Sequence, residues 1–167
     1  MSGKTIAVSD LNMLLIKADI ITAGSCLTEA SSSPAKMAKY LRGVTAFHLQ
    51  QASEKLIKIQ LYANLNKINY HKIYKHSLAD LLIYAEAEGI SVIIPRYIEE
   101  KKSIISAWVS EGRYDTHVVV RTDTLIKCLE EVETWFEQMK KSRLQVILRR
   151  KNGKQNGKYI GKRKYIG

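Results

Sequence analysis

The stretch that decides the fold is AKMAKYLRGVTAFHLQQASEKLIKIQLYAN, residues 35–64. Apolar residues recur in it every three or four positions, and this spacing places side chains on one face of an α-helix. Pro34 comes directly before it, in a serine-rich cluster that ends the preceding segment. The pattern therefore predicts a long amphipathic helix whose core face carries Met37, Tyr40, Val44, Phe47, Ala52, Leu56, Ile59 and Ala63.

The segments on either side carry the same helical period. Residues 10–30 form a predicted helix with Asp10 as its N-cap and an apolar face of Leu11, Leu14, Leu15, Ala18, Ile21 and Leu27. Ser77 is placed to cap a short helix over residues 78–88, which Gly89 ends.

Two further helices are predicted towards the end of the chain. One begins at Pro95 and runs to about residue 109, with an inward face of Ile98, Ile104, Ile105 and Trp108. The other begins near Asp123, continues to about residue 150, and carries Leu125, Leu129, Val132, Trp135, Phe136 and Met139. Residues 90–94 are β-branched and favour a short extended segment, but no strand pattern is long enough to build a sheet. We therefore expect an all-α protein, an antiparallel up-and-down bundle of four to five helices.

The positive charge is concentrated at one end. The chain has 167 residues and a net charge of +11, and its 27 Lys and Arg divide into 16 within residues 1–139 and 11 within residues 140–167, where no acid occurs. We expect a helical domain over residues 1–150 and a disordered basic tail over residues 151–167. Such a tail favours polyanions, above all nucleic acid, through Lys151, Lys154 and Lys158; a solubilising tail without a partner is the alternative.

Several classes of site have no pattern to support them. There is no glycine-rich phosphate loop, no Cys/His spacing for zinc, no inward Glu-x-x-His pair and no nucleophile elbow, so we expect neither a metal nor a cofactor. No apolar run has membrane-spanning length, and Cys26 and Cys128 fit reduced core residues. We therefore expect a cytoplasmic protein without a membrane partner.

Two polar motifs are candidates for function. In the helix over residues 35–64, Gln51, Glu54 and Lys58 are three or four residues apart and share one face, which could bind a substrate; a solvated face with Glu54 paired to Lys58 is the alternative. Further on, Arg113-Tyr114-Asp115-Thr116-His117 places a permanent cation, a phenol, a carboxylate and an imidazole side by side. These groups could bind a phosphate and move a proton near neutral pH.

In their order along the chain, these motifs resemble a known family. Residues 48–58, the Lys75-His76-Ser77-Leu78 helix start, Trp108 and Arg113-Tyr114-Asp115 follow one another as in HEPN domains (higher eukaryotes and prokaryotes nucleotide-binding), and the resemblance covers residues 10–139. It implies a helical bundle that forms a homodimer and binds RNA or nucleotide. Many members are metal-independent endoribonucleases of toxin–antitoxin or other defence systems, with an antitoxin or a nucleotidyltransferase as partner.

The resemblance also suggests residue roles. The family's Arg maps to Arg113 and its His to His117, as a variant Arg-x3-His motif, since three residues separate them here whereas nuclease members have four to six. Arg113 would stabilise the phosphate, His117 would transfer a proton, Tyr114 would bind the phosphate and Asp115 would orient His117. The Arg-Tyr-Asp start is also similar to the Arg-Tyr-Pro-Asp form of members thought to be non-catalytic. Binding of a nucleotide, RNA or partner without cleavage, and a purely structural Arg113, remain the alternatives.

Overall fold

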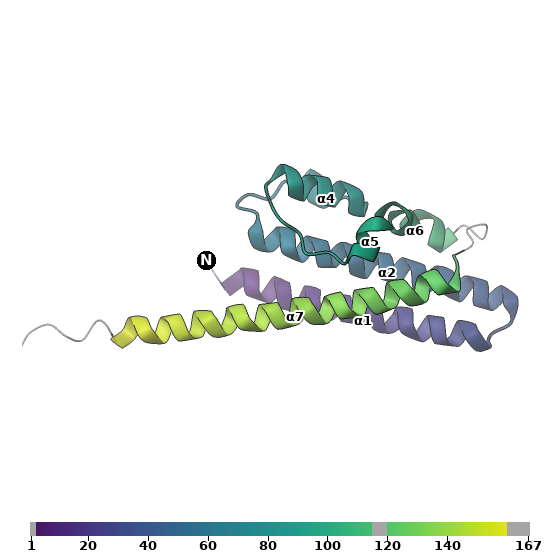
Figure 1. Cartoon of the computed structure of the whole chain (residues 1–167), viewed down its shortest axis with the longest axis horizontal. Helices are drawn as coiled ribbons and strands as arrows, with labels where there is room; N and C mark the ends of the chain where they lie inside the picture. Colours follow the sequence, from purple (N-terminus) through teal and green to yellow (C-terminus); the bar gives the residue numbers. More distant parts are fainter. Residues whose placement is uncertain (1–2, 115–119, 160–167) are drawn as a thin grey trace, which may run out of the picture. The chain divides into compact units, whose positions relative to one another are not determined.

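Helices α1 (Gly3–Ser32) and α2 (Ala35–Asn64) form the long hairpin from which the fold is built (Figure 1). The computed structural model describes residues 3–114 and 120–159, and the side chains of residues 12–109 and 120–142. Within these ranges all regular structure is helical, so the predicted all-α fold is confirmed. The predicted bounds of α2 are those observed, with Pro34 as its N-cap, whereas α1 begins at Gly3 and not after Asp10.

The packing of α1 against its two neighbours is antiparallel. Thr45 Oγ1 on α2 lies 3.4 Å from the carbonyl oxygen of Ala23, while Lys55, further along α2, pairs with the earlier Asp19. Helix α7 (Thr122–Tyr159) runs antiparallel to α1 over its first turns. Leu129 lies beside Gly24, 3.8 Å from the position of a Cβ there, and the later Phe136 lies under the ammonium of the earlier Lys17. The predicted up-and-down arrangement holds for these three helices.

Two short helices follow α2, and each has the cap that its sequence provides. Asn69 caps α3 (Tyr70–Ile73), its side chain accepting a hydrogen bond from the Lys72 N–H. The hydroxyl of Ser77 accepts a hydrogen bond from the Asp80 N–H and so caps α4 (Leu78–Ala87), as predicted. Gly89, with φ of 68°, ends the turn after α4 in the left-handed region that glycine adopts without strain.

The β-branched segment over residues 90–94 does not form a strand. The side chain of Gln60 on α2 serves as its hydrogen-bonding partner, accepting from the Ile93 N–H at 2.7 Å and donating to the Ile93 carbonyl at 3.0 Å. These two bonds pair the backbone N–H and carbonyl of Ile93 as a neighbouring strand would. The single helix predicted next is divided into α5 (Arg96–Glu100) and α6 (Lys102–Tyr114), with a turn at Lys101 between them.

The core differs in part from the predicted apolar faces. Leu14, Ile21, Met37, Tyr40 and Ile104 were predicted to be inward but are at least half exposed. On α1 the buried positions are Ile16, Ile20 and Ala23 instead, because α1 is apolar on both faces and its period alone does not identify the face that packs on α2. The predictions for Ala52, Leu56, Ile98, Ile105, Trp108, Leu125, Val132, Trp135 and Phe136 are confirmed, since all are buried.

The chain divides into two compact units, residues 1–136 and 137–167, and each is described by itself. In the second unit α7 continues to Tyr159, so residues 151–159, predicted to belong to a disordered tail, are helical; residues 160–167 lie outside the described residues. The three Lys and one Gln of residues 151–159 are good helix formers, and cations favour the C-terminal end of a helix, whereas the two Asn and two Gly of the same stretch disfavour it. The domain boundary after residue 150 stays a prediction. None of the described helices is long and apolar enough to cross a membrane.

Candidate functional site

The face of α2 that carries Glu54 and Lys58 forms an ion pair, but it is not a solvated surface. Lys58 Nζ lies 2.6 Å from Glu54 Oε1, so the pairing considered from the sequence is confirmed. Glu54 is only 4% exposed, so the solvated face considered as the alternative does not form around it. Glu54 is buried because α2 contacts α1, α4 and α6, which leaves little of the α2 surface to water. A buried carboxylate needs partners for all its lone pairs.

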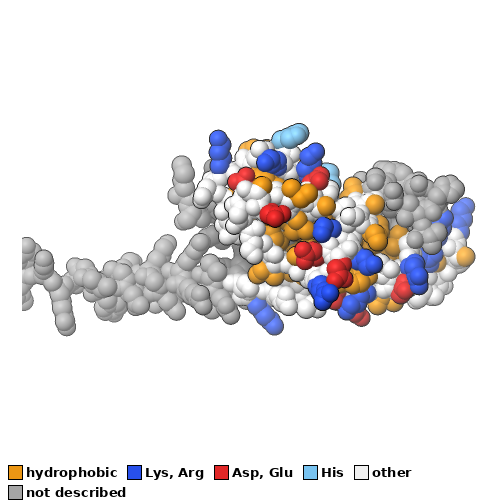
Figure 2. Space-filling view, turned by 45° about the horizontal axis from the view of Figure 1, so that its top comes forward, with side chains coloured by type: hydrophobic (Ala, Val, Ile, Leu, Met, Phe, Trp, Pro, Cys, Tyr) orange, Lys and Arg blue, Asp and Glu red, His pale blue; other side chains and the backbone are white. Residues whose placement is uncertain are grey.

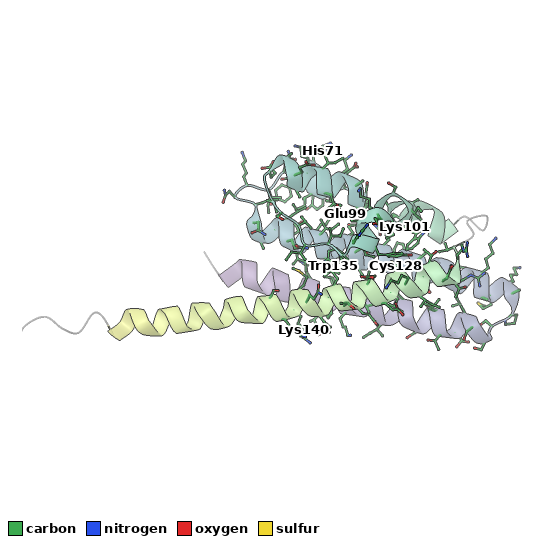
Figure 3. All side chains as sticks on the ribbon, viewed as in Figure 1. His71, Glu99, Lys101, Cys128, Trp135 and Lys140 are labelled. Carbon is green, nitrogen blue, oxygen red and sulfur yellow. The ribbon has the colours of Figure 1, made fainter. Side chains whose placement is uncertain are left out.

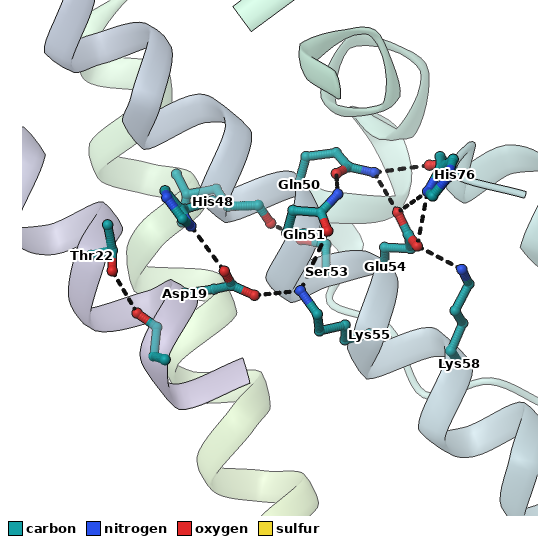
Figure 4. A network of polar contacts seen from close by, with 12 residues as sticks. Asp19, Thr22, His48, Gln50, Gln51, Ser53, Glu54, Lys55, Lys58 and His76 are labelled. Atoms are coloured by element: carbon teal, nitrogen blue, oxygen red, sulfur yellow. Dashed lines mark hydrogen bonds and ion pairs between the residues drawn. The ribbon is translucent and has the colours of Figure 1, made fainter. Parts of the chain in front are cut away.

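Two further partners complete the surroundings of Glu54 (Figure 4). Gln50 Nε2 donates to Glu54 Oε2 at 3.0 Å and to the carbonyl oxygen of His76 at 2.8 Å. His76, just before α4, places its Nδ1 3.2 Å from Glu54 Oε2. The side chain of His76 is 65% exposed. A buried carboxylate thus orients an imidazole at the surface, an arrangement suited to proton transfer.

A second carboxylate repeats this combination on the opposite side, between α1 and α2. Asp19 Oδ1 lies 2.9 Å from His48 Nδ1, and Asp19 Oδ2 lies 2.6 Å from Lys55 Nζ. Each carboxylate therefore binds one histidine and one lysine. Asp19 is the only one of these three residues that α1 contributes.

Two glutamine amides join the two carboxylate clusters. Gln51 Oε1 accepts from Lys55 Nζ at 3.4 Å, and Gln51 Nε2 donates to Gln50 Oε1 at 2.7 Å. We call the whole set the polar network; its members are Asp19, His48, Gln50, Gln51, Glu54, Lys55, Lys58 and His76. Of the predicted substrate-binding residues, it therefore brings Gln51, Glu54 and Lys58 together.

The predicted Arg113 motif is described only in part. Arg113 and Tyr114 lie in the last turn of α6, and Asp115 and His117 lie outside the described residues. Ser106 precedes Arg113 by two helical turns, so the two residues share one face of α6. The Ser106 hydroxyl accepts the Leu78 N–H at 2.9 Å, which fixes this face of α6 against the start of α4, directly after His76. The predicted Tyr114 role stays a prediction.

The three lysines predicted to contact polyanions lie in the second unit. Lys151, Lys154 and Lys158 belong to helix α7, where spacings of three and four residues place them on one helical face. Their partner stays a prediction.

Sequence reasoning missed the contributions of Asp19, His48, Gln50 and His76 to one network. Asp19 lies 29 residues before His48 and 36 before Lys55, and a single sequence gives no contact over such a separation. One signal was present: Asp19 is a carboxylate between the buried Ile16 and Ile20, where an acid requires a partner on the facing helix. Gln50 carried no comparable signal.

The thiols have no place in this network. Cys128 is fully buried on the inward side of α7 (Figure 3), and burial raises its pKa to about 12. Cys26 is half-buried, and burial raises its pKa as well. Among the residues the structure describes, no group of three or more His, Cys, Asp or Glu is placed to hold a metal ion.

Comparison with known proteins adds no relative to this picture. No protein-family model, no curated protein and no solved structure matches the chain.

Proposed function

We propose that the protein binds RNA as a HEPN-type helical domain and cleaves it without a metal ion. The observation that carries the proposal is the meeting of three elements beside His76: the polar face of α2, the start of α4, and the part of α6 around Ser106. Arg113 follows Ser106 by two turns on the same helix. These elements contact one another in pairs. An arginine and a histidine acting together supply what a phosphodiester needs for binding and proton transfer, and the sequence offers Arg113 and His117 for these roles.

Within this proposal, the residues have distinct roles. Arg113 binds the scissile phosphate, His117 exchanges a proton with the reacting 2′-hydroxyl or the leaving oxygen, and Tyr114 and Asp115 assist them. Glu54 is buried and shared among Lys58, Gln50 and His76, so we expect it to position His76 and not to touch RNA. The RNA's own 2′-hydroxyl is the nucleophile, and the products are a cyclic phosphate and a 5′-hydroxyl.

The test is a cleavage assay on single-stranded RNA in EDTA, with the purified protein and the variants Arg113→Ala and His117→Ala. We expect cleavage by the unaltered protein and a loss of about 100-fold or more in each variant, since proton transfer and phosphate stabilisation each contribute on this scale. Lys36→Ala, an exposed substitution on α2, serves as the control and should leave the rate unchanged. Equal cleavage by all four proteins would show that the activity is a contaminant.

Binding without cleavage is the second form of the proposal, and the short spacing of the motif favours it, because three residues separate Arg113 from His117. Glu54 and Lys58 are occupied by each other in both forms, so they stabilise the bundle. In this form RNA binds with measurable affinity, no product appears, and Arg113→Ala weakens binding while His117→Ala does not. Absence of RNA binding by the unaltered protein would refute both forms.

A further inference from the structure

The connection between α2 and α4 forms an exposed surface of aromatic rings and cations that the polar network does not use. Between Glu54 and Asp80 the chain has five lysines and no acid. Six of the residues that follow α2 are exposed side by side around α3, and we call them the α3 surface: Lys67, Tyr70, His71, Lys72, Tyr74 and Lys75. Figure 2 shows Lys and His side chains gathered at the top of the described part, and Figure 3 labels His71 at this outer edge.

Two tyrosine rings lie next to each other on this surface. The ring centroids of Tyr70 and Tyr74 are 5.8 Å apart with an interplanar angle of 32°. The residues are 60% and 63% exposed, although large aromatic side chains are usually buried. Tyr62, near the end of α2, belongs to the same group: burial raises its pKa, and the neighbouring Tyr74 and Tyr70 raise it further. Exposed π-faces of this kind are available to a planar ligand.

The backbone beneath the rings is fixed by a buried anchor. Ile73, between the two tyrosines, is fully buried, so α3 is held down while its neighbours point outward. The Asn69 N–H donates to the Tyr84 hydroxyl at 3.1 Å, and the Lys72 ammonium lies 5.2 Å from the centroid of the same Tyr84 ring. A ligand would therefore find the rings in place and would not have to order the loop.

We propose that the α3 surface is a docking site for single-stranded RNA, in which bases stack on Tyr70 and Tyr74 and phosphates pair with Lys67, Lys72 and Lys75. The inference rests on the proposed function and specifies which form of RNA is bound. Aromatic rings beside cations are what unpaired nucleotides need, because every base has a π-face and every linkage has a negative charge. Duplex RNA keeps its bases stacked internally and cannot offer them to the rings.

The experiment measures binding of the full-length protein to a short fluorescent oligouridine by anisotropy. We expect the double variant Tyr70→Ala/Tyr74→Ala to bind at least about tenfold more weakly, since one stacked base contributes about 5- to 150-fold. Tyr70→Phe/Tyr74→Phe should bind as the unaltered protein does, because the rings remain. Tyr40→Ala is the matched control: Tyr40 is 64% exposed on α2, outside the α3 surface, and its loss should change nothing.

The lysines are tested by salt dependence. Lys67→Gln/Lys75→Gln should lower the slope of log affinity against log salt by about 1.4, because each lysine that pairs with a phosphate of a single strand contributes about 0.7 to this slope. The affinity for a duplex RNA should be the same for the unaltered protein and for the Tyr70→Ala/Tyr74→Ala variant.

Three results would overturn the inference, and they separate it from the proposed function. If the unaltered protein binds oligouridine and the double alanine variant binds equally well, the α3 surface is not the docking site, although RNA binding stands. If polyglutamate of equal charge displaces oligouridine as effectively as unlabelled oligouridine does, the surface is a general polyanion site. If the unaltered protein binds no RNA, both proposals fail.

Discussion

Glu54 is a single residue that ties α2 to the connection before α4. Its carboxylate receives Lys58 from its own helix, Gln50 from one turn earlier, and His76 from the connection to α4. Removing it leaves the Lys58 ammonium without its carboxylate, and the Gln50 amide with only the His76 carbonyl, in a region that water barely reaches. A buried pair is costly to break for this reason, whatever its contribution when intact.

Glu54→Ala should therefore lower the free energy of unfolding by about 3 kcal/mol. The chain contains a matched control, because Arg96 and Glu100 form an ion pair of the same kind, four residues apart, with side chains 90% and 55% exposed. Glu100→Ala should cost less than about 1 kcal/mol, since water replaces the missing partner. Urea denaturation followed by helical circular dichroism gives both values, and similar losses would contradict the buried role of Glu54.

The two cysteines should differ in reactivity with a disulfide reagent. Only the thiolate reacts, and burial raises the pKa of Cys128 to about 12 while also blocking access. At pH 8 we expect one thiol, Cys26, to react in the folded protein, and Cys128 only after denaturation. The Cys26→Ser variant should show almost no reaction in the folded state. Fast labelling of that variant would mean that α7 opens readily from the bundle.

At the scale of the element, two glycines should respond in opposite directions to the same substitution. Gly89→Ala should destabilise by about 1 kcal/mol, because φ of 68° places a Cβ in the left-handed region while no neighbour lies within 4 Å to clash. Gly24→Ala should stabilise by about 0.5–1 kcal/mol, because Gly24 is inside α1 and its new Cβ would meet Leu129 at an ordinary 3.8 Å. The midpoint of thermal unfolding, compared with that of the unaltered protein, should fall for Gly89→Ala and rise for Gly24→Ala. A shift of both midpoints in the same direction would contradict this prediction.

Elements were predictable where local chemistry marks them. The bounds of α2 and α4 follow from Pro34, Ser77 and Gly89, which cap or end a helix through their own backbone and side chain. The inward face of α1 was not predictable, since Leu14 and Ile21 are as apolar as Ile16 and Ile20. The turn at Lys101 has no proline or glycine to mark it, and the structure offers no physical account of it.

The candidate site was predictable from the sequence where it depends on local helical spacing, and not where it depends on contacts between distant segments. Gln51, Glu54 and Lys58 share a helical face, which a spacing of three or four residues dictates. That Glu54 is buried and bound to His76 depends on a contact across 22 residues, which only the packing of α2 against α4 creates. Arg113 was singled out by its residue type, and the structure places its backbone in the last turn of α6.

At the scale of the whole molecule, the uneven charge of the chain should govern how affinity for RNA responds to salt. Lys151→Gln, Lys154→Gln and Lys158→Gln in one protein should lower the salt slope of RNA binding by about 2, because each lysine that pairs with a phosphate contributes about 0.7. Lys36→Gln/Lys39→Gln, at exposed positions on α2, should leave the slope unchanged. Equal slopes for both variants would assign RNA binding to another part of the chain.

The glutamine pair between the two carboxylates gives the polar network a direction. Lys55 donates to Gln51, Gln51 donates to Gln50, and Gln50 donates to Glu54, so every proton points from the ammonium towards the carboxylate. An ammonium can only donate and an ionised carboxylate can only accept, and the two ends therefore dictate the orientation of both amides. Neither amide can turn over without its neighbour. A change of charge near His76 would therefore leave both amides as they are, because the Lys55 ammonium still cannot accept a hydrogen bond and the His76 carbonyl still cannot donate one. The side chains of one helix thus hold the two carboxylate clusters in a single arrangement.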